Sequence, residues 1–329
     1  MEHSLKSFHI LIVGAGELGS RHLQGLLKVN FPAFIDVLDT NYESLERCKQ
    51  RENEVKRSPL ILGITYHIEH KSIAKAYDLC IIATTSNVRL AVIKSLVDVA
   101  IFRFFLLEKV LFQKPIDFEE ALKIFQDNNI KAWINCPRRT YKLYNDIKSK
   151  INNEIVTISI LGGEWGLACN AIHYIDLFSF LTDSKDFSYD LSGVTQIINS
   201  KRSGFYEFGG TISIRNSNSS ELILHSRIGN RSQSLINIIT DSNSWIIDEA
   251  RCELMEFECI NNWELTRKTY ETIYQSNLTN IISEEILIKG YSSLPEYTVN
   301  ECIHKEMIIE FTKVFIRNNF EYSNGCPIT

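Results

Sequence analysis

Residues 8–27 read FHILIVGAGELGSRHLQGLL, and this stretch decides the fold. The apolar run 10–13 is typical of a parallel β-strand that is buried on both faces. Gly14, Gly16 and Gly19 follow at once in G-x-G-x-x-G spacing, and the next segment carries leucines for one apolar side of a helix. The pattern indicates a strand, a tight turn and a helix, which is the context that makes this glycine spacing informative.

Each glycine has a physical task in such a unit. Gly14 permits the tight turn, Gly16 has no side chain to keep a pyrophosphate from the backbone, and Gly19 lets the helix pack close to the sheet. The helix start offers N–H groups to phosphates, so we expect Glu17 and Leu18 to contact the ligand there. Three glycines alone also occur in an ordinary strand-turn-helix. The flanking context therefore carries the prediction of a dinucleotide site.

The end of the next strand predicts which dinucleotide is bound. The apolar run 34–38 ends in Asp39, twenty residues after Gly19. A carboxylate at this place could accept hydrogen bonds from the ribose hydroxyls of NAD, and it would repel the 2′-phosphate of NADP. Thr40 and Asn41 bring no positive charge. The sequence therefore predicts NAD, with NADP as the less favoured cofactor.

The composition excludes several classes of function. The chain has 329 residues, of which 44% are hydrophobic and 23% charged, as expected for a globular protein with more than one domain. A formal net charge of −5 argues against nucleic acid as the partner. We find no signal-peptide core, and no apolar run that reaches the roughly 18 residues of a membrane span. The eight cysteines form no CxxC, and nothing completes a metal site around His67 and His70. We therefore expect a cytoplasmic protein without metal and with reduced thiols.

Strands and helices alternate through the first part of the chain. This rhythm predicts a doubly wound parallel sheet of the Rossmann type, and we expect the NAD-binding domain to comprise residues 1–135. The expected strands are 60–65, 78–84, 102–107 and 130–134, and the expected helices are 42–51, 88–97 and 117–127.

Polar residues follow two of these strands. Thr84, Thr85 and Asn87 come after one strand, and Glu108 and Lys109 come after the next. Ligands of open α/β sheets bind outside the carboxyl ends of the strands, so we expect these residues to line the cofactor crevice. Simple capping of the following helix is an alternative for the first group, and it is compatible with the same position.

The second domain is expected over residues 136–329. Helices are predicted at 141–150 and 169–181, a strand at 155–161, and several short β-branched runs between 193 and 249. Turn residues separate these runs, so we predict an open, largely antiparallel sheet with helices on one face. The other face of this sheet must also be covered, and we expect that a second subunit packs against it. A capping box at 298–301 begins a last helix, which we expect to pack back on the first domain.

Four motifs carry a resemblance to a known family. They are GAGELGSRH at 14–22, LEKVLF at 107–112, NCPRRTY at 135–141 and NAIHYIDLF at 170–178. In this order the chain resembles the Gfo/Idh/MocA family of sugar and cyclitol oxidoreductases, over nearly its whole length. The resemblance implies NAD or NADP as cofactor. It also implies that Lys109, the lysine of an E-K-P motif, and His173, the histidine of an H-x-x-D helix, act on the substrate carbinol.

Elementary chemistry supports the same two residues. An ammonium group at a strand end, such as that of Lys109, could hydrogen-bond the substrate oxygen and favour its partial negative charge. The imidazole of His173 could take the hydroxyl proton while a hydride leaves for the nicotinamide. The alternatives are a surface lysine, and a histidine satisfied by Asp176 on the same helix face.

Two positions depart from the family pattern, and three more residues could contact the substrate. Val110 stands where the family usually has proline. Cys169 stands where it often has aspartate, and a thiol does not supply a fixed negative charge. Asn170 could donate to a substrate hydroxyl. Arg138 and its neighbour Arg139 could bind an anionic group, with an ion pair inside the fold as the alternative.

These observations predict an NAD-dependent oxidoreductase that acts on a secondary alcohol or ketone of a sugar, cyclitol or activated sugar. The 165–178 segment looks like that of family members in surface-glycan biosynthesis, so we expect a substrate of that kind. We expect a homodimer or homotetramer that associates through the second sheet. The alternative is a catalytically inactive NAD-binding sensor or regulator on the same fold, which the departures at Val110 and Cys169 would favour.

Overall fold

A computed structural model describes residues 6–271, 273–320 and 325–329, and it divides the chain into two compact units. The first unit comprises the chain up to Phe112, Ile116–Asn135 and Ile273–Glu301. The second comprises Gln113–Pro115, the chain from Cys136 to residue 271, and the chain from Cys302 onwards. The predicted division at residue 135 is a single cut, and the two descriptions differ because the chain returns to the first unit for Ile273–Glu301.

The first unit contains a six-stranded parallel sheet in the order β3-β2-β1-β4-β5-β6. Its strands are β1 Phe8–Val13, β2 Ala33–Leu38, β3 Ile61–His67, β4 Ala76–Ile82, β5 Ile101–Leu107 and β6 Lys131–Ile134. Its crossover helices are α1 Glu17–Leu26, α2 Tyr42–Glu52, α3 Arg89–Val97 and α4 Pro115–Asp127. The chain runs from β1 towards β3 and then crosses to β4 on the other side of β1. This reversal confirms the predicted doubly wound Rossmann sheet, and it places the switch point where β1 and β4 end.

Both faces of this sheet are covered, as the continuous apolar runs predict. On one face Ile10 and Ile12 share a buried cluster with residues of α1 and α2. On the other face Phe105 meets Phe125 of α4 with ring centroids 5.6 Å apart.

The returning segment adds helix α7, Gln275–Glu284, and a π-helical turn, Glu285–Lys289, for which the sequence pattern gives no prediction. Helix α7 packs directly against α1. Leu278 and Ile282 belong to the same core as β1. A Cβ atom on Gly25 would lie 2.6 Å from the Cβ of Thr279, so glycine is what allows the two helices to approach so closely.

The second unit contains a nine-stranded mixed sheet. Eight of its strands follow the order β15-β14-β13-β12-β7-β11-β10-β8, and β9 pairs with β10. The strands are β7 Thr157–Gly162, β8 Phe187–Asp190, β9 Val194–Asn199, β10 Tyr206–Asn216, β11 Glu221–Ser226, β12 Leu235–Ile239, β13 Asn243–Asp248, β14 Glu253–Glu258 and β15 Thr266–Thr269. Between the described strands, β7 and β11 are parallel and the other pairs are antiparallel. The predicted largely antiparallel sheet is confirmed.

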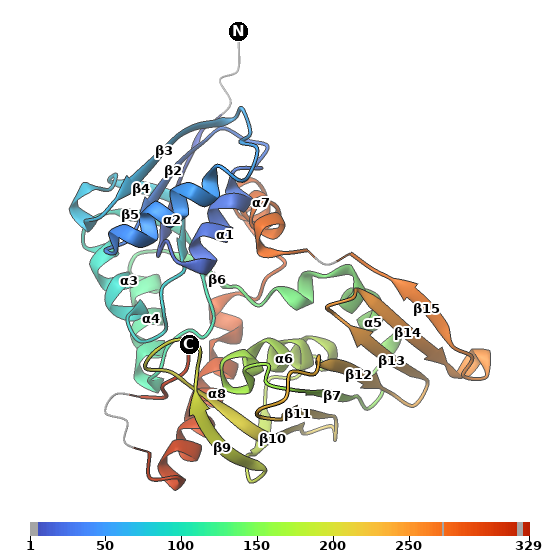
Figure 1. Ribbon diagram of the computed structural model, residues 1–329. Coiled ribbons are helices and arrows are strands. Elements are labelled where there is room, and N and C mark those ends of the chain that lie inside the picture. The colour runs from blue at the N-terminus through green and yellow to red at the C-terminus, as the bar shows by residue number, and fades with distance from the viewer. Residues whose placement is uncertain (1–5, 272, 321–324) are drawn as a thin grey trace. The chain divides into compact units, whose positions relative to one another are not determined.

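The helices of the second unit are α5 Lys142–Ile151, α6 Leu167–Thr182 and most of α8 Tyr297–Arg317. Helix α6 packs against β10 and β11, and α5 packs against α6 (Figure 1). Helix α8 begins in the first unit, and from Cys302 it belongs to the second, where Phe311 and Phe315 pack on Phe208 of β10. In the described part of the chain, no helix is both long enough and apolar enough to span a bilayer.

Candidate active site

The glycine turn of the first unit has the geometry that its spacing predicts. Gly14 adopts a φ of +96°, which favours glycine, and its N–H donates to the Leu38 carbonyl at 2.8 Å. A Cβ on Gly19 would lie 1.7 Å from the Gly14 oxygen, so the start of α1 could not approach the turn with any other residue there. A Cβ on Gly16 would have no atom within 4 Å. The backbone at Gly16 therefore faces open space, as a site for a diphosphate requires.

The Asp39 side chain is held at this turn by Ala15, which lies 24 residues earlier in the chain. Its carboxylate accepts hydrogen bonds from the backbone N–H groups of Ala15 at 2.7 Å and of Asn41 at 2.8 Å. Glu17 turns its side chain to Arg51, whose guanidinium reaches both carboxylate oxygens at 2.7 Å and lowers the pKa of Glu17. The same arginine donates to Ser20 at 2.6 Å. A carboxylate therefore lies beside the glycine turn, and Arg51, one of three basic residues of α2, is bound to Glu17 and Ser20.

The turn after β4 lies beside the glycine turn. A Cβ on Gly14 would be 3.1 Å from the Thr84 nitrogen. Thr85 donates a hydrogen bond to the Asn87 side chain at 2.7 Å, which shapes the entry to α3. The structure thus brings the predicted cofactor residues of the β1 and β4 ends together, with Leu18 at the exposed start of α1.

Glu108 is buried and faces the interior of the unit. It is 3% exposed, and its carboxylate accepts from His22 Nε2 at 2.8 Å and from Asn135 Nδ2 at 2.5 Å. Burial opposes ionisation, but these hydrogen bonds outweigh it and hold the pKa of Glu108 below its ordinary value. The other ring nitrogen of His22, Nδ1, forms a hydrogen bond with the Thr279 hydroxyl of α7 at 3.0 Å. One carboxylate oxygen of Glu108, Oε1, is therefore occupied by two hydrogen bonds within the unit.

Lys109 follows directly and is partly exposed. The next residues, Val110 and Leu111, are fully buried, and the Lys109–Val110 peptide bond is cis. Arg89, which is 1% exposed, donates from its guanidinium to the carbonyls of Val110, Leu111 and Thr84. This arginine ties the segment after β5 to the turn after β4, and the motif analysis gives no sign of it.

In the second unit, α6 carries the remaining candidates. From Ala171 to Ser179, His173 is the residue that is not buried, and Asn170 lies one turn earlier on the same partly exposed stripe. Asn170 donates to the Trp165 carbonyl at 3.0 Å. Cys169 is buried, and its N–H donates to the carboxylate of Glu207 at 3.1 Å. Glu207 belongs to β10, so sequence spacing could not place it at the start of this helix.

The two arginines of the 135–141 motif are bound within the fold. Arg138 donates to both oxygens of Glu249 at 3.0 and 2.7 Å and lies over the Tyr174 ring, 4.3 Å from its centroid. Arg139 donates to both oxygens of Asp176 at 3.0 and 2.6 Å, and Asp176 is fully buried. Of the two alternatives from the sequence, the structure shows the internal ion pair for each arginine.

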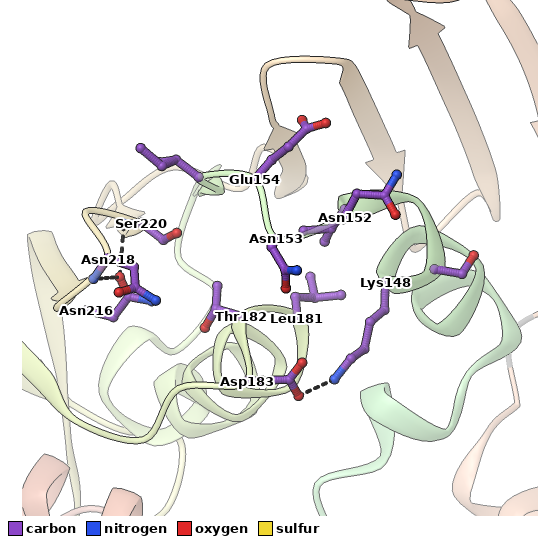
Figure 2. A pocket seen from close by; sticks show the side chains of 13 residues that line it. Lys148, Asn152, Asn153, Glu154, Leu181, Thr182, Asp183, Asn216, Asn218 and Ser220 are labelled. Carbon is purple, nitrogen blue, oxygen red and sulfur yellow. Dashed lines mark hydrogen bonds and ion pairs between the residues drawn. The ribbon is translucent and has the colours of Figure 1, made fainter.

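A polar cavity of about 400 Å³ lies elsewhere in the second unit (Figure 2). It is formed by the ends of α5 and α6 and the turn between β10 and β11. Lys148 bonds Asp183 at its edge, and the Asn216 oxygen accepts from the N–H groups of Asn218 and Ser220 at 3.0 Å (Figure 2). Thr182 on its wall is nine residues after His173, about 14 Å along the helix. No predicted site residue lines this cavity. Within the described chain, no group of three or more His, Cys, Asp or Glu side chains could hold a metal ion.

Among the comparisons with known proteins, the one with solved structures identifies the fold. No family model matches the sequence, and a search of curated proteins gives no match. Among solved structures, the chain is similar to UDP-N-acetylglucosamine 3-dehydrogenase GnnA of Acidithiobacillus ferrooxidans, with 13% identity, a TM-score of 0.65 and coverage of 96% of this chain and 99% of that one.

Two further structures are similar over comparable lengths. Scyllo-inositol dehydrogenase of Lactobacillus casei, solved with NAD(H) and scyllo-inositol, has 16% identity, a TM-score of 0.65 and coverage of 95% and 98%. An oxidoreductase of Agrobacterium radiobacter, solved with NAD+, L-tartaric acid and magnesium, has 13% identity, a TM-score of 0.68 and coverage of 95% and 97%. The chain therefore has the fold of these dehydrogenases, which is the fold that the resemblance to the Gfo/Idh/MocA family implies.

Proposed function

We propose that this protein is an NAD-dependent oxidoreductase acting on a CH–OH group or ketone of a sugar, cyclitol or activated sugar. The observation that carries the proposal is the contact between Asp39 and the glycine turn. A carboxylate fixed to the Ala15 N–H, beside the open backbone at Gly16, fits a diphosphate with an adjacent ribose. The fold is also that of a UDP-N-acetylglucosamine dehydrogenase and of an inositol dehydrogenase.

The preference for NAD follows from charge. Asp39 supports binding of a ribose with two free hydroxyls and opposes a 2′-phosphate. Arg51 of α2 reaches the start of α1, where it is bound to Glu17 and Ser20, so recruiting it for a phosphate would break those contacts. We therefore assign NAD, with Gly14, Gly16 and Asp39 as its principal contacts, and Glu17, Leu18, Gly19, Thr84, Thr85 and Asn87 around them.

We assign the chemistry to Lys109 and His173. A bound nicotinamide supplies the hydride acceptor or donor. The Lys109 ammonium donates a hydrogen bond to the substrate oxygen, and the His173 imidazole takes the hydroxyl proton during oxidation or returns it during reduction. Asn170 shares the partly exposed stripe of α6 with His173 and is our candidate for a contact with a neighbouring hydroxyl of the substrate. For the substrate we favour an activated sugar of surface-glycan biosynthesis, since the name of GnnA gives it a nucleotide sugar.

The carboxylate of Glu207 favours catalysis over an inactive protein. The sequence places Cys169 where the family often has aspartate, and a thiol brings no fixed charge. In the structure Glu207 bonds the Cys169 N–H at the first turn of α6. A buried carboxyl group thus lies next to that position, although it comes from strand β10 and not from the helix itself.

The second candidate function is a sensor or regulator that binds NAD without turning over a sugar. The observation that favours it is the buried thiol of Cys169, which is chemically unlike a carboxylate. This second candidate function predicts NAD binding, no turnover of any polyol or nucleotide sugar, and no increase in turnover in Cys169→Asp.

One experiment separates the two candidates. The purified protein is titrated with NAD by calorimetry and then assayed for NADH formation with inositols, hexoses and UDP-sugars. We expect turnover with at least one sugar, and a loss of about 100-fold or more in kcat for His173→Ala. Asn145→Ala, an exposed change on α5, serves as the matched control. Turnover of His173→Ala at the parental rate would reject the role of the imidazole.

We also propose that the protein forms a homodimer or homotetramer through the sheet of the second unit. On β7, Ile158 and Ile160 are buried on the face that carries the helices, while Leu161 points to the other face and is 46% exposed. Leu235 and Ile239 of the neighbouring strand are also exposed on it. Sedimentation of the parent and of Leu161→Glu tests this, since a charge in an apolar interface should dissociate it.

A further inference from the structure

The polar cavity of the second unit lies at the C-terminal end of α6. Its walls are the ends of α5 and α6 and the turn between β10 and β11 (Figure 2). Sites for small molecules usually have volumes of about 300–1,000 Å³. At about 400 Å³ this cavity is large enough for one small ligand, and the wall residues decide which chemistry it can bind.

The wall at the end of β10 contains a buried amide with unused donors. Asn216 is 8% exposed, and its side-chain oxygen accepts from the backbone N–H groups of Asn218 and Ser220 at 3.0 Å. Its side-chain nitrogen is buried and has no hydrogen-bond partner among the described residues. A buried N–H group without an acceptor costs free energy, and native structures supply a partner for nearly all such groups. A ligand oxygen at this wall would supply that partner.

The charged side chains of the cavity oppose an anionic ligand. Lys148, Glu154 and Asp183 line it. Lys148 donates to the Asp183 carboxylate at 2.5 Å and to the Phe180 carbonyl at 2.6 Å, so its ammonium group is engaged at the end of α6 (Figure 2). Glu154 accepts from the Ser242 N–H at 2.9 Å and brings a negative charge to the cavity. A phosphate or carboxylate would have to displace Asp183 from Lys148 and approach Glu154.

The two helix ends favour hydroxyl groups as ligands. The last carbonyl groups of a helix lack partners within it and carry partial negative charge. A hydroxyl group can donate to such carbonyls and can also accept from the Asn216 amide. An alkylammonium ion can only donate, so it would leave the Asn216 donors unsatisfied. Asn153, in the turn after α5, adds a second amide that both donates and accepts (Figure 2).

We propose that this cavity is a binding site for a neutral polyhydroxylated molecule, a sugar or cyclitol, whose oxygens accept from Asn216 and whose hydroxyls donate to the ends of α5 and α6. Thr182 on the cavity wall is about 14 Å along α6 from His173, so a monosaccharide bound there does not reach the proposed catalytic imidazole. The site therefore goes beyond the proposed function and does not rest on it.

The test follows hydrogen exchange of the backbone by mass spectrometry and needs neither NAD nor turnover. The protein is titrated in turn with glucose, N-acetylglucosamine and myo-inositol. We expect at least one of them to slow exchange in segments 152–156 and 216–220, which belong to two walls of the cavity. Sodium phosphate and ethylammonium chloride are the charged probes, and they should leave both segments unchanged.

Asn216→Asp tests the amide itself. Its carboxylate can keep the two hydrogen bonds from the turn, but it loses the N–H donors. The midpoint of the titration should rise by about tenfold or more. Asn153→Gly removes the second amide and tolerates the same φ of +62°, and it should also raise the midpoint. Asn199→Asp, the same chemical change at an exposed position of β9, is the matched control and should keep the parental midpoint.

Three results would overturn the proposal. They are no response to any of the three polyols, an unchanged midpoint in both Asn216→Asp and Asn153→Gly, and a response of the same segments to a charged probe instead. Protection confined to residues 167–174 would indicate binding at the proposed active site, and it would likewise count against this cavity. A lack of NADH formation in the turnover assay concerns the proposed function alone.

Discussion

Replacing His22 by alanine should destabilise the first unit strongly, because it leaves a buried charge without its main partner. The imidazole is fully buried and bonds Glu108 at 2.8 Å and Thr279 at 3.0 Å. Removing one partner of a buried ion pair costs about 3–5 kcal/mol, and the void left by the ring adds to this. The free energy of unfolding of a domain is about 5–15 kcal/mol in total, so His22→Ala should remove a fifth or more of the stability of the unit.

The pH dependence of this loss has a definite sign. In the parent, the pKa of Glu108 lies below its ordinary value of 4.5, so its stabilisation is present above that pH and disappears as the pH falls through the lowered value. In His22→Ala the carboxylate is buried with less compensation, and its folded-state pKa should rise above 4.5. The cost of the substitution should therefore be largest near neutral pH and shrink towards pH 4.5.

Hydrogen exchange followed by mass spectrometry is the suitable assay, because it reports each unit separately. Amides of β4 should lose protection in His22→Ala, while those of β12 in the other unit should keep it. His9→Ala, an exposed histidine of β1, is the matched control. The double variant His22→Ala/Glu108→Gln should be more stable than the sum of the single changes by about 1–2 kcal/mol, since it removes the stranded charge. A loss below about 1 kcal/mol, or strict additivity, would refute the reasoning from burial.

Three further predictions concern single residues. Asp39→Ser should weaken NAD binding by about tenfold or more in calorimetry, because the ribose loses a charged hydrogen-bond acceptor. It should also reduce the difference in affinity between NAD and NADP, because the repulsion of the 2′-phosphate is lost. Gly19→Ala should abolish NAD binding and lower the melting temperature, because the new Cβ would lie 1.7 Å from the Gly14 oxygen. Glu256 is buried, but hydrogen bonds from Lys150, Lys268 and Trp245 outweigh the burial and lower its pKa to about 2. Its stabilisation should be present above pH 4.5 and fade as the pH falls towards 2, so acid denaturation of the second unit should become less steep in Glu256→Gln.

Local patterns were enough to predict the parallel sheet of the first unit and its crossover helices. A strand buried on both faces needs an uninterrupted apolar run, and β1 and β4 show such runs in the sequence. The turn between strand and helix needs glycine at φ values that other residues avoid, and Gly14 adopts such a value. The position of Asp39 at the next strand end followed from the same logic. Each of these features is decided within about twenty residues of chain.

Features that depend on distant pairing could not be predicted in the same way. Strand β7 lies between β12 and β11, and its neighbours come more than sixty residues later in the chain. The short edge strand β15 consists of exposed polar residues, and such a composition carries no period-2 signal. Helix α7 was missed because its apolar residues form only a short stripe, and its place on α1 depends on Gly25. Arg89 and Glu207 reach their partners from other elements, so motif spacing gave no sign of either.

Burial separates the residues of the shared motifs into two kinds. Glu108 and Asp176 lie in motifs that resemble an enzyme family, yet both carboxylates are buried against His22 and Arg139 respectively. A buried charge that is already hydrogen-bonded is costly to redirect, so neither carboxylate is free to turn towards a ligand without losing these bonds. Lys109 and His173 adjoin these anchored groups in sequence, one residue and three residues away, and both are partly exposed. Each of these two motifs therefore pairs a fixed carboxylate in the interior of its unit with a partly exposed residue, and this partly exposed residue is the one to which we assign the chemistry under our proposal.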